Sequence, residues 1–134
     1  MKNIVFDSYA LIALFRQEPG YELVRELLVK IAADEREGYI TTINIGEVYY
    51  MTCRKSNQKN AEAALDALLK FPLQMIDADL KLSLEAAKLK AKYALSYADA
   101  FAAALTIVKK ATLITGDDEF ESLKNEPGFK VKYL

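Results

Sequence analysis

The chain contains no histidine. Catalysis by a Ser-His-Asp or Cys-His arrangement is therefore excluded, because in both arrangements the imidazole takes the proton of the nucleophile. Cleavage of RNA by two histidines that act as acid and base is excluded for the same reason. Any hydrolytic chemistry must depend on carboxylates, a lysine, a tyrosine or a bound metal ion.

Cysteine and long hydrophobic runs are also scarce. Cys53 is the only cysteine, so an internal disulfide is impossible and a reducing compartment is indicated. The longest mainly apolar run, Ala100 to Val108, is too short to span a bilayer. Met1-Lys2-Asn3 precedes only a short apolar stretch, which does not fit a signal peptide. We expect a cytoplasmic protein.

The 134 residues suit one folded domain. Hydrophobic residues make up 52% of the chain, which is enough for a core, and the 28% of charged residues argues against a membrane protein. The net charge of −1 neither indicates nor excludes a nucleic-acid partner, because a local basic patch can bind phosphates in a chain of balanced charge.

Strand and helix patterns alternate along the chain. We expect strands at Ile4–Phe6, Tyr39–Thr42, Leu73–Ile76, Thr112–Thr115 and Phe129–Tyr133. Helices are expected at Ser8–Glu18, Tyr21–Glu37, Ile45–Lys55, Lys59–Lys70, Leu80–Tyr93, Tyr97–Lys110 and, as a short helix, Asp117–Asn125. This alternation predicts an α/β fold with a mostly parallel sheet that helices cover on both faces. Such sheets bind ligands at the carboxyl ends of their strands.

Four acidic residues are expected at that edge of the sheet. Asp7 follows the first strand, Asp117 follows the fourth, and Glu47 and Asp99 lie near the starts of helices. Three of them have a structural alternative: Asp7 and Asp117 are plausible helix N-caps, and Asp99 lies three residues after Ser96 in a pattern close to a capping box. Glu47 has nothing to cap, and packing would favour a small or apolar residue at its position.

Carboxylates that converge in this way require compensation. Two of them about 4 Å apart repel by roughly 4 kcal/mol at an effective dielectric constant near 20. Either some are protonated or cations are bound between them. Oxygen ligands without histidine or cysteine favour Mg²⁺ or Mn²⁺, and such ions can activate water and stabilise charge on a phosphodiester.

The acids lie in four segments that extend from the first residues to the last quarter of the chain: residues 4–12 (IVFDSYALI), 44–48 (NIGEV), 95–104 (LSYADAFAAA) and 113–120 (LITGDDEF). In this order and spacing they resemble the PIN-domain family, and within it the VapC-like toxins of toxin–antitoxin pairs. The resemblance implies a metal-dependent ribonuclease specific for single strands. It also implies a three-layer α/β/α sandwich with a parallel five-stranded sheet in the order 3-2-1-4-5.

The resemblance implies roles and partners as well. Asp7, Glu47, Asp99 and Asp117 become the catalytic acids and the ligands of one or two Mg²⁺ or Mn²⁺ ions. Supporting positions fall at Ser8 and Thr115, and Asp118 competes with Asp117 as the fourth acid. The implied partners of this single domain, residues 1–134, are RNA, a second copy in a homodimer and a small antitoxin that blocks the site. We expect water, not the 2′-hydroxyl of the RNA, to attack the phosphorus, which leaves 5′-phosphate and 3′-hydroxyl ends.

RNA held against an acidic pocket needs basic groups nearby. The candidate RNA contacts are Arg16, Arg54, Lys55 and Lys59, each of which could instead be part of an ordinary solvated helix surface. Tyr9, Tyr50 and Tyr97 lie near the acidic segments and could stack on bases, although packing in the core or in a dimer is the alternative.

Other small α/β proteins also carry acids at strand ends. A receiver-like signalling domain needs paired acids after the first strand and a lysine after a late strand, but here Asp7 is followed by Ser8 and the late lysine is missing. A phosphatase of the haloacid-dehalogenase type needs Asp-x-Asp, and Tyr9 occupies the second acidic position. A non-catalytic binding module would be expected to lack one of the four acids. A PIN nuclease that matures RNA, in place of a toxin, stays open.

Overall fold

A sheet of five parallel strands forms the centre of the computed structural model, which describes residues 1–134. The strands are β1 (Asn3–Phe6), β2 (Glu37–Thr41), β3 (Gln74–Ile76), β4 (Thr112–Thr115) and β5 (Val131–Tyr133). Their order is β3-β2-β1-β4-β5, and every neighbouring pair is parallel. The predicted fold class and strand order are therefore confirmed.

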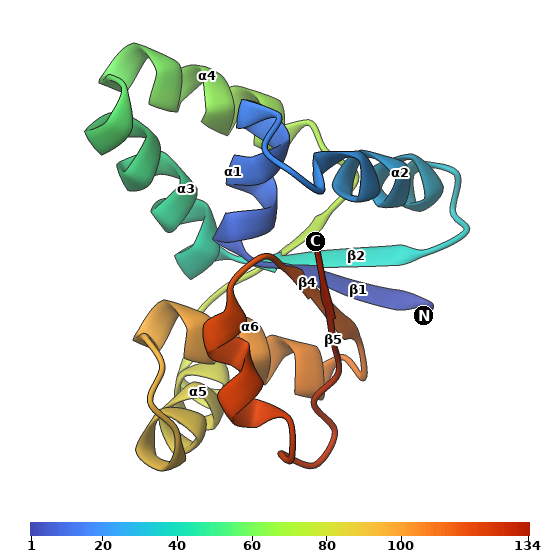
Figure 1. Cartoon of the computed structure of the whole chain (residues 1–134), viewed down its shortest axis with the longest axis vertical. Coiled ribbons are helices and arrows are strands. Elements are labelled where there is room, and N and C mark those ends of the chain that lie inside the picture. The colour runs from blue at the N-terminus through green and yellow to red at the C-terminus, as the bar shows by residue number, and fades with distance from the viewer.

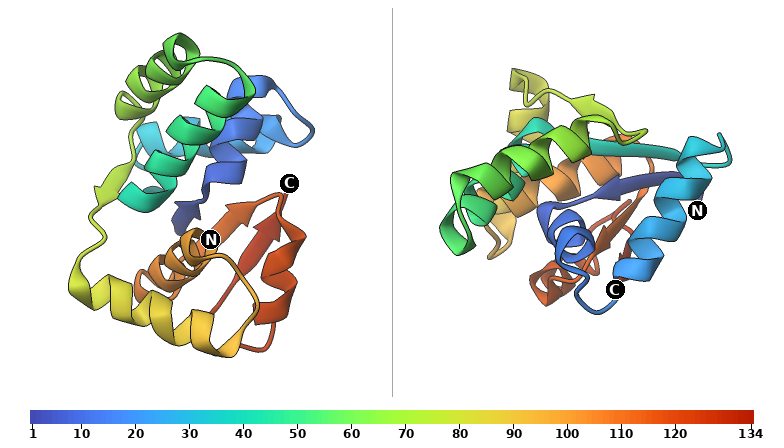
Figure 2. Two further views of the ribbon diagram at one scale, coloured as in Figure 1. Left: turned by 90° about the vertical axis from the view of Figure 1, so that its left-hand side faces the viewer. Right: turned by 90° about the horizontal axis from the view of Figure 1, so that it is seen from above.

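Helices cover the sheet on both faces, which gives a three-layer α/β/α sandwich (Figure 1). One layer contains α1 (Ser8–Arg16), α2 (Tyr21–Ala32), α3 (Thr42–Lys55) and α4 (Gln58–Leu69). The other contains α5 (Leu80–Lys92), α6 (Tyr97–Val108) and the 3₁₀ helix η1 (Asp118–Leu123). In the left view of Figure 2, β3 carries the chain from α4 in the first layer to α5 in the second.

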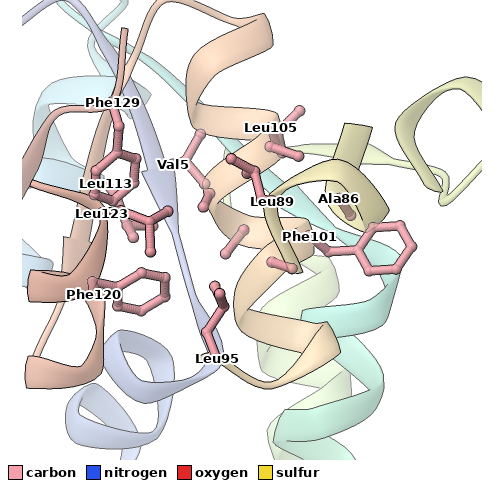
Figure 3. Packing of buried hydrophobic residues seen from close by; sticks show 14 of the residues in the cluster. Val5, Ala86, Leu89, Leu95, Phe101, Leu105, Leu113, Phe120, Leu123 and Phe129 are labelled. Carbon is pink, nitrogen blue, oxygen red and sulfur yellow. The ribbon is translucent and has the colours of Figure 1, made fainter. Parts of the chain in front are cut away.

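The core is divided between the two faces of the sheet because successive strand side chains point in opposite directions. On β1, Ile4 and Phe6 belong to the cluster under α1–α4, whereas Val5 belongs to the cluster with α5 and α6. Figure 3 shows this second cluster, with Leu105 of α6 close to Val5 and Phe120 of η1 beside the sheet. Both faces of β1 and β4 are therefore buried, as in other parallel sheets.

The central position of β1 determines where a ligand site can form. The chain leaves β1 towards β2 on one side, and later returns to add β4 on the other. At this point the connections after β1 and β4 diverge to opposite faces and leave a crevice at the carboxyl ends of the strands. No helix of the molecule is long and apolar enough to cross a membrane.

Several predicted boundaries were wrong. Helix α2 ends at Ala32, not at Glu37, because Asp34 adopts a left-handed conformation (φ 60°) that ends the helix. Gly38 lies within β2, where a Cβ atom would come 2.5 Å from Ile31 Cδ1. The segment predicted as the short helix Asp117–Asn125 is the 3₁₀ helix η1, and Phe129 packs in the core before β5 begins.

Candidate functional site

The four predicted acids meet at the carboxyl edge of the sheet, where β1 and β4 lie side by side. A cavity of about 220 Å³ opens there. Its lining consists of Asp7, Ser8, Tyr9, Glu47, Met51, Ser96, Asp99, Asp117 and Glu119. The acidic cavity, as we call it, therefore has five carboxyl groups and no lysine or arginine in its wall.

Asp7 lies at the bottom of the acidic cavity and is 1% exposed. It caps α1: its Oδ1 accepts a hydrogen bond from the Ala10 amide at 2.9 Å, while Oδ2 accepts one from the Thr115 hydroxyl. Burial raises the pKa of Asp7 to about 7, although both hydrogen bonds oppose the rise, and the charges of Asp99 and Asp117 add to it. Asp7 therefore both caps α1 and lines the acidic cavity.

Asp99 enters the cavity from the first turn of α6. The Ser96 hydroxyl caps this helix by accepting a hydrogen bond from the Asp99 amide at 3.1 Å. Asp99 is 8% exposed, and burial, followed by the charges of Asp117 and Glu47, raises its pKa to about 7. Asp7 and Asp99 can therefore each hold a proton close to neutral pH, because burial disfavours their charged forms and the neighbouring carboxylates repel a further negative charge.

The acids after β4 are positioned by Thr115. Its hydroxyl oxygen accepts a hydrogen bond from the Asp117 amide at 3.0 Å, and Asp117 in turn accepts one from the Glu119 amide at 2.9 Å. Asp117 and Glu119 both line the acidic cavity, whereas Asp118, between them, does not. Glu119 was not among the residues predicted from the sequence. The sequence feature that could have indicated it is the run of three acids after Gly116, of which the first and third line the cavity.

Glu47 is held by two polar neighbours. The Ser8 hydroxyl donates to Glu47 Oε1 at 2.6 Å, and the Asn44 side-chain amide lies 3.3 Å from the same oxygen. Asn44 is fully buried, and its amide also donates to the Ala98 carbonyl at 3.4 Å, which connects α3 to the start of α6. Asn44 belongs to one of the characteristic sequence segments, but this role was not predicted for it.

The donor set suits a hard divalent cation. Carboxylate oxygens of Asp99, Asp117 and Glu119 lie within 4.8 Å of one another, and Asp7 and Glu47 face the same cavity. These are oxygen ligands without any sulfur or imidazole, a set that favours Mg²⁺ or Mn²⁺ over zinc or copper. A cation would also favour the charged forms of Asp7 and Asp99, against the burial and the mutual repulsion that raise their pKa values.

The basic residues predicted to contact RNA lie outside the acidic cavity. Lys55 lines a neighbouring cavity of about 170 Å³. Arg16 lines a larger cavity of about 460 Å³, which has no carboxyl group in its wall and lies between α1, α3 and α4. Arg54 lies over the ring of Tyr50, 5.3 Å from its centroid, and Lys59 is exposed on α4.

Comparisons with known proteins agree with this architecture. The crystal structure of VapBC2 from Rickettsia felis, bound to a DNA fragment from its promoter, contains a similar chain (TM-score 0.75, 20% identity, 98% of each chain covered). DNA-bound VapBC from Salmonella typhimurium gives a TM-score of 0.75 at 16% identity, covering 99% of this chain and 98% of the other.

A third similar structure is VapC20 from Mycobacterium tuberculosis, described as a toxin that cleaves the sarcin-ricin loop (TM-score 0.72, 17% identity, 90% of this chain and 95% of the other covered). No curated protein sequence is significantly similar to this chain. The family model of the PIN domain matches residues 4–126, a range that contains all five carboxyl groups of the acidic cavity. The chain therefore belongs to the PIN-domain family.

Proposed function

We propose that this protein is a Mg²⁺- or Mn²⁺-dependent endoribonuclease and the toxin of a toxin–antitoxin pair. The observation that carries the proposal is the acidic cavity, where five carboxyl groups converge without a basic partner and two of them have pKa values near 7. An arrangement this unfavourable without a cation is typical of a functional site.

Asp7, Asp99 and Asp117 would be the principal ligands, with Glu47 and Glu119 completing the site directly or through water. When bound, the cation supplies positive charge to the phosphodiester and makes water a better nucleophile at neutral pH. Ser8 and Asn44 fix the carboxylate of Glu47, and Thr115 fixes both Asp7 and the backbone of Asp117. Such supporting contacts keep acidic side chains in the geometry that the reaction needs.

The residues that are present indicate which group attacks the phosphorus. The chain has no histidine to take the proton of a 2′-hydroxyl, so water is the nucleophile that the site favours. Hydrolysis then leaves a 5′-phosphate and a 3′-hydroxyl. Products that carry a 2′,3′-cyclic phosphate would contradict this mechanism.

RNA as the substrate is supported by family membership and by the likeness to VapC20, which is described as a toxin that cleaves the sarcin-ricin loop. A cognate antitoxin is supported by the likeness to VapBC structures, a family that is described as toxin–antitoxin systems. A second copy of the chain is the other partner we propose, because Leu80 (75% exposed) and Leu84 (53% exposed) leave an apolar stripe on α5.

The nuclease assay compares wild type with Asp7→Asn and Asp99→Asn on structured RNA in Mg²⁺, in Mn²⁺ and with chelator. We expect cleavage by wild type with either metal and none by the two variants. Asp118→Asn is the matched control, because it removes a neighbouring carboxylate that does not line the acidic cavity. Equal activity of wild type, Asp7→Asn and Asp99→Asn would refute the proposal.

The toxin role is tested separately in cells. Induction of the wild-type chain should stop growth, and co-expression of the cognate antitoxin, to be sought as a short open reading frame beside the gene, should restore it. Cleavage in vitro without growth arrest would support the nuclease activity, contradict the toxin role and favour a role in RNA maturation.

A further inference from the structure

Tyr9 carries an exposed aromatic ring that no other ring or cation in the molecule contacts. Three tyrosines near the acidic segments have the same exposure, 45%: Tyr9, Tyr50 and Tyr97. Tyr50 lies under Arg54, and Tyr97 packs on Phe101 with 5.0 Å between ring centroids. Tyr9 has no such partner, so its ring is available to a ligand.

The position of the Tyr9 ring depends on Gly116, in the turn after β4. A Cβ atom at residue 116 would lie 2.2 Å from Tyr9 Cε1 and 2.7 Å from Cδ1. Only glycine therefore allows the ring to rest on this turn, directly beside the segment that positions Asp117. One side of the ring lies against Gly116, while 45% of Tyr9 stays exposed.

Tyr9 also forms the boundary between two cavities. It lines the acidic cavity and, together with Met51, also lines the cavity of about 170 Å³ next to it. We call the latter the side cavity; its other residues are Ile12, Glu18 and Lys55. The side cavity thus combines apolar walls and an aromatic ring with a lysine that forms no ion pair.

We propose that the side cavity receives the base of the nucleotide next to the cleaved phosphodiester, stacked on Tyr9, with Lys55 contacting the adjoining phosphate. The proposal rests on the proposed function, because it assumes that the cleaved bond lies in the acidic cavity. A base can reach the ring only when it is unpaired, so this contact selects single-stranded or looped RNA. Stacking on an aromatic ring tolerates any base, so Tyr9 selects substrates by their unpaired structure more than by their sequence.

In the alternative, purely structural role, the Tyr9 ring would only cover Gly116 and shield this turn from solvent. The two roles differ in what the ring must do. A cover needs bulk, and its loss lowers the stability of the fold. A stacking platform needs an aromatic face, so Tyr9→Phe keeps the function and Tyr9→Ala loses it without a comparable loss of stability.

The test measures binding of a fluorescein-labelled, unstructured RNA of about 12 nucleotides by fluorescence anisotropy. The full chain carries Asp7→Asn so that RNA is not cleaved during the measurement in Mg²⁺. Tyr9→Ala, Tyr9→Phe and the control Tyr50→Ala are compared in this background, and the unfolding midpoint of each variant is recorded. We expect Tyr9→Ala to raise the Kd about 5- to 150-fold, and Tyr9→Phe and Tyr50→Ala to change it less than about twofold.

Gly116→Ala gives an independent variant, because its methyl group displaces the Tyr9 ring. It should weaken RNA binding when Tyr9 is present and add little when Tyr9 is already alanine, since the two changes remove the same contact. Additive effects of the two substitutions would overturn the inference. So would an unchanged Kd for Tyr9→Ala, a loss in Tyr9→Phe equal to that in Tyr9→Ala, or no binding of the RNA by the parent chain.

The inference and the proposed function can fail separately. If the wild-type chain cleaves RNA and Tyr9→Ala cleaves it with the same KM, the nuclease function stands and the stacking role of Tyr9 is refuted. Binding that depends on Tyr9 without any metal-dependent cleavage keeps the stacking site and removes the nuclease.

Discussion

Replacing Asp7 by asparagine should stabilise the metal-free protein at neutral and alkaline pH while it abolishes cleavage. Asparagine caps a helix as well as aspartate does, so the bond to the Ala10 amide can be kept. The variant removes a carboxyl group that is 1% exposed and has a pKa of about 7 in the folded chain, against 3.8 for the ordinary group.

The size of the effect follows from proton linkage. A raised pKa in the folded state means that Asp7 favours folding below pH 3.8, and that this contribution is lost as the pH rises through about 7. Between pH 5 and pH 7 the folded chain keeps a proton that the unfolded chain has released. Each pH unit then lowers the free energy of unfolding by about 1.4 kcal/mol, or about 3 kcal/mol over this range.

The assay is urea unfolding of wild type and Asp7→Asn in chelator at pH 5 and pH 8. Wild type should lose up to about 3 kcal/mol more of its unfolding free energy between these pH values than the variant does. Differences in hydrogen bonding between the aspartate and the asparagine that replaces it cancel, because they do not depend on pH. Mg²⁺ or Mn²⁺ at pH 8 should stabilise wild type more than the variant. Equal losses in both proteins, with Asp118→Asn as the exposed control, would refute the account of Asp7.

Three further substitutions test other contacts. Thr115→Val should reduce turnover about 10- to 100-fold and destabilise the fold by about 1–3 kcal/mol, because it removes the hydroxyl shared by Asp7 and the Asp117 amide. Thr115→Ser should retain most of the turnover and of the stability. Equal losses in the serine and valine variants would contradict this role of the hydroxyl. Glu119→Gln should raise the Mn²⁺ concentration needed for half-maximal cleavage about 10-fold, and an unchanged metal requirement would exclude Glu119 from the site. Gly38→Ala should lower the free energy of unfolding in urea by about 1–3 kcal/mol, because the new methyl would lie 2.5 Å from Ile31 Cδ1; an unchanged urea midpoint would show that the core relaxes there.

The sequence predicted the sheet and the four acids because both depend on short, local patterns. Apolar β-branched runs marked β1 and β4, and an acid directly after a parallel strand must lie at one edge of the sheet. The end of α2 was harder to predict, because Glu37 and Gly38 have weak strand propensity. They form a strand because β1 pairs with them, Glu37 opposite Asn3 and Gly38 opposite Ile4.

The supporting residues of the site could not be predicted in the same way. Asn44 acts through a contact with Ala98, 54 residues away, which no local pattern contains. Asp118 and Glu119 are adjacent, and adjacent residues of any helix point in different directions, so the path of the chain from β4 into η1 decides which of them lines the cavity. Long-range packing and the path of the chain after β4, more than residue identity, decide which side chains face the cavity.

The bond from Thr115 to Asp7 joins residues 108 positions apart, and Asp117 and Glu119 follow Thr115 immediately. A chain still on the ribosome therefore cannot complete the acidic cavity until its last segments have emerged and β4 has joined β1. Fragments from interrupted translation or from proteolysis before residue 115 lack two of the five carboxyl groups and the hydroxyl that orients Asp7. If the proposed nuclease function holds, this order of synthesis keeps incomplete copies inactive.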